Sequence, residues 1–240
     1  MWNHRSSAPL GPLPKKGSRL DVVNYRPVSL LPVLSKILER AVNDQLNSYL
    51  AKKGILYGFQ SGFRKGFSTE TCLLNLCDHV KEQTSKGNFT GMILIDLQKA
   101  FDCVDHGLLL EKMSTMGISS IDWFRSYLND RFQCTQVDGV DSSFLAVNCG
   151  VPQGSILGPT LFLCYINDMA DALNCRLSLY ADDSALIYSA PDPRSVSRFL
   201  SDELDICHKW LIDNRLSLHL GKTECILFGP KAPFEFGCRF

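Results

Sequence analysis

The sequence lacks any apolar run of about 18 residues or more, and this absence argues against a membrane-spanning helix. Its longest apolar stretch, residues 161–166, is followed at once by Asn167 and Asp168. The N-terminus also lacks a basic region followed by an apolar core of about 7–15 residues, so we expect no signal peptide. These absences predict an intracellular protein, nuclear or cytoplasmic, without contact with a membrane.

Cysteine pairs of the kind that bind metals are also missing. Ten cysteines are scattered along the chain, with no Cys-x-x-Cys pair. Most of them lie within apolar helix or strand patterns, where cysteine behaves as a small hydrophobic residue. This distribution predicts reduced thiols rather than a secreted disulfide framework, and it argues against a zinc site.

The chain has no net charge, but its charges are unevenly distributed. Residues 1–70 hold 11 Lys or Arg against 4 Asp or Glu, whereas residues 71–240 hold 14 against 21. A basic N-terminal part and an acidic C-terminal part suit an enzyme that binds phosphates with the first part and metal ions with the second. The alternative is that charge varies along the chain without functional meaning.

Periodicity and capping signals predict a mixture of helices and mostly antiparallel strands, which is an α+β layout. Residues 1–20 are rich in Pro, Gly and Lys and are expected to be extended or disordered. We expect helices between Ser35 and Gly54, from Ser68 or Thr69 to near Gly87, and over 106–116, 120–129, 159–171 and 192–214. Strands are expected over 89–97, 132–138, 143–149, 177–180, 185–188 and 225–228, with the helices to one side of the sheet.

Two adjacent acids, Asp182 and Asp183, lie between two runs of strand-forming residues, where a hairpin normally has small turn residues. Adjacent carboxylates repel each other, and a cation that neutralises them makes the pair tolerable. Asp96 ends the strand predicted over 89–97 and can lie beside this hairpin, although a single strand-end acid is more often only solvated. Together the three acids predict a site for two Mg²⁺ ions about 4 Å apart, with Mn²⁺ as a substitute, that would clamp the attacking hydroxyl and the leaving pyrophosphate of an in-line displacement.

Two further loops have residues suited to a nucleotide. Arg64 and Lys65 lie in a Gly-rich loop and can bind triphosphate oxygens. Gln153 can hydrogen-bond a nucleotide from a Pro-Gln-Gly turn, while Gly154 allows a close approach of the backbone. Taken alone, the first pair would more often be solvated charges and the second an ordinary turn.

Five segments in this order resemble motifs of reverse transcriptases. They are Asn24 to Leu30, Gln60 to Thr69, Asp96 to His106, Gly150 to Pro159 and Tyr180 to Asp183. The amino-acid sequences of these segments are similar to those of non-LTR (LINE-type, jockey- or CR1-like) retrotransposon polymerases, and the resemblance extends over about residues 12–229. The resemblance implies the fingers and palm of a right-hand polymerase, with an antiparallel palm sheet backed by helices.

The resemblance also implies roles for single residues. Asp96 and Asp182 would ligate both metals, with Asp183 in support. Phe101 would lie against the sugar of the incoming nucleotide and exclude a 2′-hydroxyl, although without the motif its expected role is core packing. Lys222 lies in the region that supplies a general acid to pyrophosphate, although a loop lysine is usually only solvated.

The implied domains are an extended or disordered segment over 1–20, a fingers-like region over 21–90, a palm over 91–229 and a C-terminal tail over 230–240. Part of 105–150 would contribute to the fingers, and we expect the helical thumb to be absent. The implied function is RNA-directed DNA polymerisation, with an RNA template, a DNA primer and deoxynucleoside triphosphates as partners. Two alternatives stay open: a catalytically silent retrotransposon remnant that folds and binds RNA, and a carboxylate–metal phosphohydrolase of another fold.

Overall fold

The computed structural model describes residues 6–14, 18, 20–21, 24–137 and 139–230. The predicted tail therefore lies outside the described residues, apart from its first residue. The chain forms two compact units, each built from two separate stretches. The first unit comprises Met1–Ile55 and Phe101–Tyr165, and the second unit comprises Leu56–Ala100 and Ile166–Phe240.

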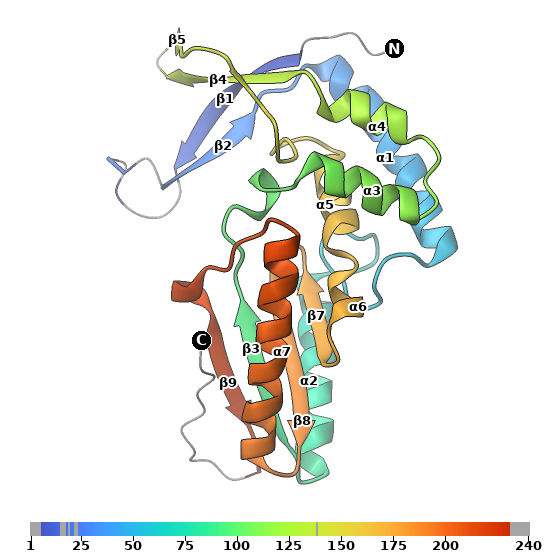
Figure 1. Ribbon diagram of the computed structural model, residues 1–240, viewed down its shortest axis with the longest axis vertical. Helices are drawn as coiled ribbons and strands as arrows, with labels where there is room; N and C mark the ends of the chain where they lie inside the picture. Colours follow the sequence, from blue (N-terminus) through green and yellow to red (C-terminus); the bar gives the residue numbers. More distant parts are fainter. Residues whose placement is uncertain (1–5, 15–17, 19, 22–23, 138, 231–240) are drawn as a thin grey trace. The chain divides into compact units, whose positions relative to one another are not determined.

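The second unit contains a four-stranded antiparallel sheet in the order β7-β8-β3-β9 (Figure 1). Its strands are β7 (Arg176–Tyr180), β8 (Asp183–Ala190), β3 (Phe89–Ile95) and β9 (Glu224–Phe228). The central strand β3 pairs with β8 on one side, where Ile93 lies opposite Leu186, and with β9 on the other, where Ile93 lies opposite Cys225.

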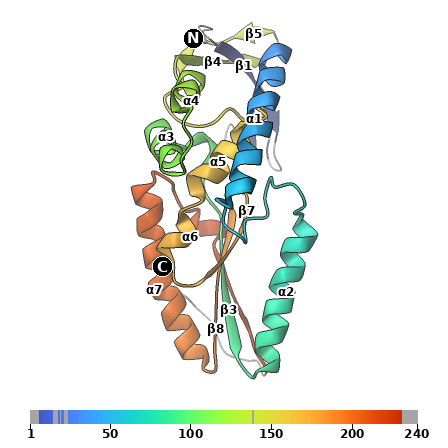
Figure 2. The same cartoon turned by 90° about the vertical axis from the view of Figure 1, so that its right-hand side faces the viewer.

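Helices cover both faces of this sheet. Figure 2 shows α7 (Pro193–Asp213) on one side of β3 and β8 and α2 (Thr69–Ser85) on the other. Phe199 of α7 stacks on Tyr188 of β8, with ring centroids 3.9 Å apart. On the α2 face, Leu76 and Val80 pack against a cluster made of Met92, Ala185 and Ile187. The α+β class is confirmed, but the expectation of helices on one side is wrong, because β3 is apolar on both of its faces.

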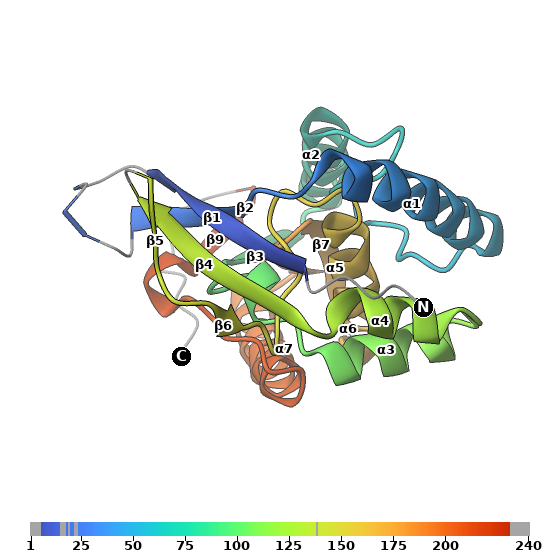
Figure 3. The same cartoon turned by 90° about the horizontal axis from the view of Figure 1, so that it is seen from above.

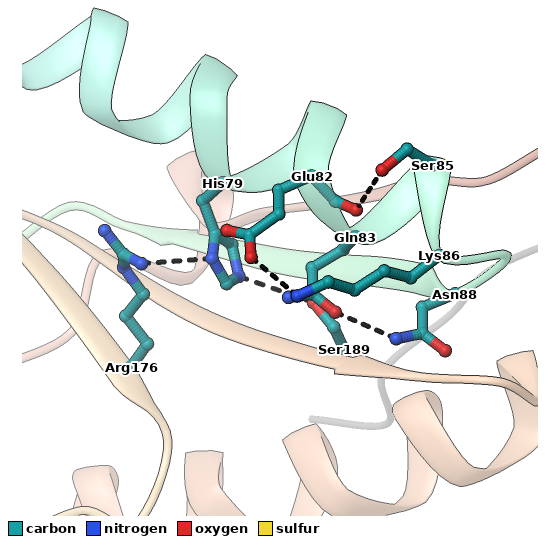
Figure 4. A network of polar contacts seen from close by, with 8 residues as sticks. All are labelled: His79, Glu82, Gln83, Ser85, Lys86, Asn88, Arg176 and Ser189. Atoms are coloured by element: carbon teal, nitrogen blue, oxygen red, sulfur yellow. Dashed lines mark hydrogen bonds and ion pairs between the residues drawn. The ribbon is translucent and has the colours of Figure 1, made fainter.

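Polar contacts also attach α2 to the sheet (Figure 4). The Nη1 atom of Arg176 on β7 lies 3.0 Å from Nδ1 of His79 on α2. The other ring nitrogen of His79, Nε2, lies 3.4 Å from the Ser189 hydroxyl on β8. At its start α2 has a capping box, in which Ser68 and Thr71 each accept a hydrogen bond from the backbone of the other. Ser68 is therefore the N-cap, one of the two residues that the sequence predicted.

The first unit contains a sheet in the order β2-β1-β4-β5, with β6 also paired to β4. Its strands are β1 (Ser6–Pro14), β2 (Tyr25–Ser29), β4 (Arg131–Val137), β5 (Val140–Asp141) and β6 (Leu145–Ala146). Strand β1 runs parallel to β4 and antiparallel to β2 (Figure 3). The N-terminal segment is therefore extended over 6–14, and the strand expected over 143–149 is only two residues long.

The helices of the first unit are α1 (Val33–Lys53), α3 (His106–Thr115), α4 (Ile121–Leu128) and α5 (Gly158–Ile166). Helix α1 begins two residues before Ser35, the predicted cap. It ends at Lys53 and is followed by Gly54, whose φ of 62° suits a left-handed C-cap. The single helix expected over 159–171 is instead α5 followed by the short α6 (Met169–Ala172). The break falls at Asn167, whose side chain accepts a hydrogen bond from the Tyr57 backbone N–H at 2.8 Å.

The two compact units are defined by packing within the chain, and the expected domains over 1–20, 21–90, 91–229 and 230–240 stay predictions. Helix α2 packs on β3 and β7, so the stretch from Leu56 to Ala100 stays together in the second unit. The assignment of fingers and palm to particular residues stays a prediction. Among the described residues, none of the helices is long and apolar enough to cross a bilayer.

Candidate carboxylate site

The three predicted acids emerge at the same end of the sheet in the second unit. Tyr180 pairs with Asp183, so Ala181 and Asp182 form the turn between β7 and β8. Ile95 at the end of β3 pairs with Ser184, the neighbour of Asp183. Asp96, which follows Ile95, therefore leaves the sheet beside the hairpin turn. Two features place these acids near one another: each lies at the end of a strand, and β3 pairs with β8.

The acids influence one another electrostatically. Partial burial is the largest cause that raises the pKa of Asp183, followed by the negative charges of Asp182 and Asp96. The ammonium of Lys222 acts in the opposite direction and lowers it. Lys222 also forms an ion pair with Asp96, with Nζ 2.9 Å from Oδ2, although 63% of the lysine side chain is exposed. Lys222 thus compensates part of the negative charge at this turn.

The loop that carries Lys222 is attached to the strand end at Asp96. The His219 N–H donates to the Asp96 carbonyl at 2.8 Å, and the Gln98 N–H donates to the Ser217 carbonyl at 2.8 Å. Lys222 lies in a short 3₁₀ helix that follows, Leu220–Lys222. The predicted general acid is therefore held next to one of the predicted metal ligands.

The donor set suits a hard divalent cation. Carboxylate oxygens are the ligands that Mg²⁺ and Mn²⁺ prefer, and a cation would relieve the repulsion on Asp183. In the part of the chain that the structure describes, no three His, Cys, Asp or Glu side chains form a ready metal-binding group. The chemistry of these residues fits a divalent ion, and the geometry of a two-metal centre stays a prediction.

Gln60 is a residue of this site to which the sequence analysis gave no role. Its side chain is buried, and its Oε1 atom accepts hydrogen bonds from the N–H groups of Gly62 at 2.8 Å and Ala181 at 3.1 Å. A side chain at Gly62 would place Cβ 2.1 Å from the Ala181 nitrogen, so only glycine fits there. The signal in the sequence was Gln60-Ser61-Gly62, which lies in one of the segments that resemble reverse transcriptase motifs. That signal did not indicate Ala181 as the hydrogen-bond partner of Gln60.

The predicted triphosphate ligands lie in the same loop. Arg64 donates through Nη1 to the carbonyls of Tyr57 at 2.8 Å and Gln60 at 2.9 Å, and its guanidinium lies 4.3 Å from the centre of the Phe67 ring. Burial lowers the pKa of Arg64. Lys65 is exposed. Arg64 thus stabilises its own loop, and its binding to a triphosphate stays a prediction.

The other predicted nucleotide-binding residues, Phe101, Gln153 and Gly154, belong to the first unit. The Phe101 ring stacks on the buried Phe162 at 4.4 Å, and its carbonyl accepts from Val151 N–H at 2.8 Å. Gln153 donates through Nε2 to Asp102 Oδ1 at 2.8 Å. These bonds bring residues 101–102 and 150–154 together.

Gly154 adopts a φ of 92°, and a Cβ there would lie 3.2 Å from the Val28 side chain. The Ser29 N–H donates to the Gln153 carbonyl at 2.9 Å. A further residue missed from sequence, Glu39 on α1, is buried and accepts from the Ile156 N–H at 2.7 Å. The loop that contains Gln153 and Gly154 is thus held from β2 and from α1.

Comparison with known proteins gives one family. The profile described as "Reverse transcriptase (RNA-dependent DNA polymerase)" matches residues 13–236. The "Probable RNA-directed DNA polymerase from transposon BS" of Drosophila melanogaster is 34% identical over 202 residues, which are 79% of this chain and 22% of that protein. The "RNA-directed DNA polymerase from mobile element jockey" of Drosophila funebris is 31% identical over 218 residues, 87% of this chain and 24% of that protein. The chain thus spans less than a quarter of the length of these relatives.

Solved structures with a similar fold include telomerases. Telomerase from Candida albicans, in complex with a fragment of telomeric RNA, has a TM-score of 0.67 at 12% identity and covers 92% of this chain and 41% of that chain. Apo telomerase from Candida tropicalis, truncated from its C-terminal domain, has a TM-score of 0.62 at 13% identity, covering 92% and 50%. At these identities the likeness concerns the fold alone.

Proposed function

Since the chain belongs to the reverse transcriptase (RNA-dependent DNA polymerase) family, we propose that it is the part of an RNA-directed DNA polymerase that adds deoxynucleotides to the 3′-hydroxyl of a DNA primer on an RNA template. The resemblance to polymerases of non-LTR retrotransposons is confirmed by the family match and by the relatives from mobile elements. The observation that carries the proposal is the emergence of Asp96, Asp182 and Asp183 at one end of one sheet.

In this function Asp96 and Asp182 hold two Mg²⁺ ions, with Asp183 in support. The bound ions supply Lewis-acid stabilisation of the charge that develops on the attacking and leaving oxygens. Lys222, whose ammonium already contacts Asp96, holds the proton that the leaving pyrophosphate requires. Asp182 and Asp96 repel the charge of Asp183, and bound cations would relieve this repulsion.

The remaining predicted residues bind the nucleotide and the template. Arg64 and Lys65 take triphosphate oxygens, Phe101 lies against the sugar, and Gln153 and Gly154 position the base pair. The template and primer form an A-form hybrid, which proteins recognise mainly by shape and backbone contacts. We also propose that the protein acts inside the cell, where its nucleic-acid partners are found.

Primer extension tests the proposal. The 240-residue chain is incubated with an oligo(dT) primer on poly(A), dTTP and Mg²⁺, and incorporation is compared with that of Asp182→Ala. We expect Mg²⁺-dependent extension by the wild type and a loss of at least about 100-fold in the variant, because a ligand of the ions that stabilise the developing charge is removed. Absence of extension by the wild type, at high protein concentration and low salt, would contradict the proposed activity of this chain and leave its fold unaffected.

A second candidate function is a folded remnant that binds RNA without catalysis. The internal hydrogen bonds of Arg64 and Gln153 favour it, because both side chains already have partners within the protein. It predicts salt-sensitive RNA binding, unaltered by Asp96→Ala, together with no incorporation. The same extension assay therefore separates the two functions.

A further inference from the structure

The turn that carries Asp182 has a strained backbone. Ala181, its first residue, has a φ of 58°, in the left-handed region that residues with a Cβ seldom adopt. Ala181 is also buried, with 6% of its surface exposed. Its backbone N–H points away from water and needs a partner within the protein. Such a turn persists only where surrounding groups hold it.

Gln60 supplies that partner. Its Oε1 atom accepts from the Ala181 N–H at 3.1 Å and from the Gly62 N–H at 2.8 Å, and 2% of the residue is exposed. Because both partners are donors, the orientation of the amide is determined by the hydrogen bonds. The Nε2 atom is buried and has no hydrogen-bond partner among the described residues. The acceptor oxygen is thus the atom that the protein uses.

The backbone on either side of Gln60 is attached to the strand that leads into the turn. The Ser61 N–H donates to the Leu179 carbonyl at 2.8 Å, and the Leu179 N–H donates to the Phe59 carbonyl at 3.0 Å. Arg64 donates through Nη1 to the Gln60 carbonyl at 2.9 Å. Gly62 lies against the Ala181 backbone, where no side chain fits. The backbone that carries the Gln60 side chain is therefore held by hydrogen bonds and has little freedom to move.

We propose that Gln60 is a positioning residue that holds Ala181 in the left-handed conformation and thereby fixes the direction of Asp182 and Asp183. Without its acceptor oxygen, Ala181 relaxes toward ordinary backbone angles and the two carboxylates no longer share one arrangement. The consequence for catalysis rests on the proposed function, whereas the conformational part stands on the hydrogen bonds alone.

The test compares two substitutions at Gln60 with a matched control. Gln60→Met keeps the length of the side chain but replaces the amide with a thioether, which is only a weak acceptor, and Gln60→Glu keeps an acceptor oxygen. The control is Glu203→Met. Glu203 is buried in the same unit and accepts from the backbone N–H groups of Asn174 and Cys175, just before the far end of β7.

Three properties are measured: amide hydrogen exchange at Ala181 by NMR, binding of Mn²⁺ alone by electron paramagnetic resonance, and single-nucleotide incorporation. We expect Gln60→Met to accelerate exchange at Ala181 by about tenfold or more, since one buried hydrogen bond is lost. Mn²⁺ binding weakens and incorporation falls with it. Gln60→Glu retains slow exchange at Ala181, and Glu203→Met leaves exchange at Ala181, Mn²⁺ binding and incorporation unchanged.

Unchanged exchange at Ala181 and unchanged Mn²⁺ binding in folded Gln60→Met would overturn the proposal. Equal effects of Glu203→Met on these two properties would also overturn it, because the effect would then be one of general stability. If Gln60→Met does not fold, Gln60→Glu decides, and fast exchange at Ala181 in that variant sinks the proposal. A wild type that incorporates no nucleotide contradicts the proposed function, but the exchange and Mn²⁺ measurements still test the role of Gln60.

Discussion

Asp183 shows at the scale of one residue how a functional site lowers stability. Its pKa is raised by partial burial and by two neighbouring carboxylates, so the folded protein holds this proton more tightly than the unfolded chain does. As pH rises from the unfolded pKa through the raised folded pKa, ionisation destabilises the folded state, and this cost is fully present at neutral pH. Solvent screening keeps the cost small, because Asp183 is partly exposed.

Asp183→Asn should therefore be more stable than the wild type at pH 7. We expect the melting temperature to rise by about 1–3 °C, which corresponds to less than about 1 kcal/mol for a chain of this size. At pH 3 or below, where the wild-type carboxyl is protonated, the two proteins should melt together. Calorimetry at both pH values checks this, and Mg²⁺ should stabilise the wild type more than the variant. A variant that melts lower at pH 7 would show that Asp183 stabilises the fold instead.

Some residues of the site could be located from the sequence because neighbouring residues indicate their position. The contacts of other residues depend on segments far away in the chain. Asp96, Asp182 and Asp183 each lie at a strand end, and a strand end can be recognised from its neighbours. The role of Gln60 could not be predicted, because its partner at Ala181 is 121 residues away. The internal bonds of Arg64 were likewise invisible, because a Gly-rich loop with two cations does not show which carbonyls face the guanidinium.

At the scale of elements, the attachment of α2 to the sheet depends on a neutral histidine. Arg176 donates to Nδ1 of His79, which a protonated ring cannot accept, and Ser189 faces the other nitrogen. Burial is the largest cause that lowers the pKa of His79, and the charge of Arg176 lowers it further. The charge of Glu82 on α2 raises this pKa, and the charge of Lys86, the C-cap of α2, lowers it further.

This contact predicts a loss of stability in mild acid. The folded pKa of His79 lies below the unfolded value of about 6.5, so its contribution is present above that value and is lost as pH falls through and below it. Relative to the wild type, His79→Gln, whose amide oxygen can still accept from Arg176, should reduce the fall in melting temperature between pH 7.5 and 5. Thermal melts over this range provide the measurement, and His208→Gln, at an exposed position on α7, is the control. Parallel pH profiles for His79→Gln and the wild type would exclude this role.

Elements with strong local signals were predicted well. The start of α2 followed from Ser68. The helix expected over 192–214 from apolar periodicity is α7, which begins at Pro193 with Asp192 as its N-cap. The break between α5 and α6 could not be predicted, because the group that binds Asn167 is Tyr57, 110 residues earlier. The apolar run from Met92 to Ile95 in β3 signalled that both sheet faces are covered, but that run does not identify the covering helices.

For the whole molecule, the uneven charge predicts how nucleic acid binds. Residues 1–70 contain 11 basic and 4 acidic residues. Binding of nucleic acid should therefore depend on salt, although the whole chain has no net charge. We expect the affinity for an RNA–DNA hybrid to fall by at least about tenfold between 50 and 200 mM salt, because cations on the hybrid are released on binding. Fluorescence anisotropy measures this, and Asp182→Ala should show the same salt slope. Binding that is insensitive to salt would contradict it.

The order of the five motifs along the chain identified the family. It does not show which segments pack together: α2 and β3 lie in one compact unit, where Leu76 and Val80 of α2 pack on a cluster that includes Met92 of β3. The division into fingers and palm stays a prediction.

The place of β3 at the centre of its sheet has a consequence for synthesis on the ribosome. β3 ends at Ile95, while its neighbour β8 begins at Asp183 and β9 only at Glu224. At about 5–20 residues per second, this strand emerges roughly 5–20 s before its first neighbour is made. During that interval both of its edges and the face that α7 later covers lack their final partners, although α2 has already been made. The nascent chain is therefore open to chaperones and to wrong pairing with other chains.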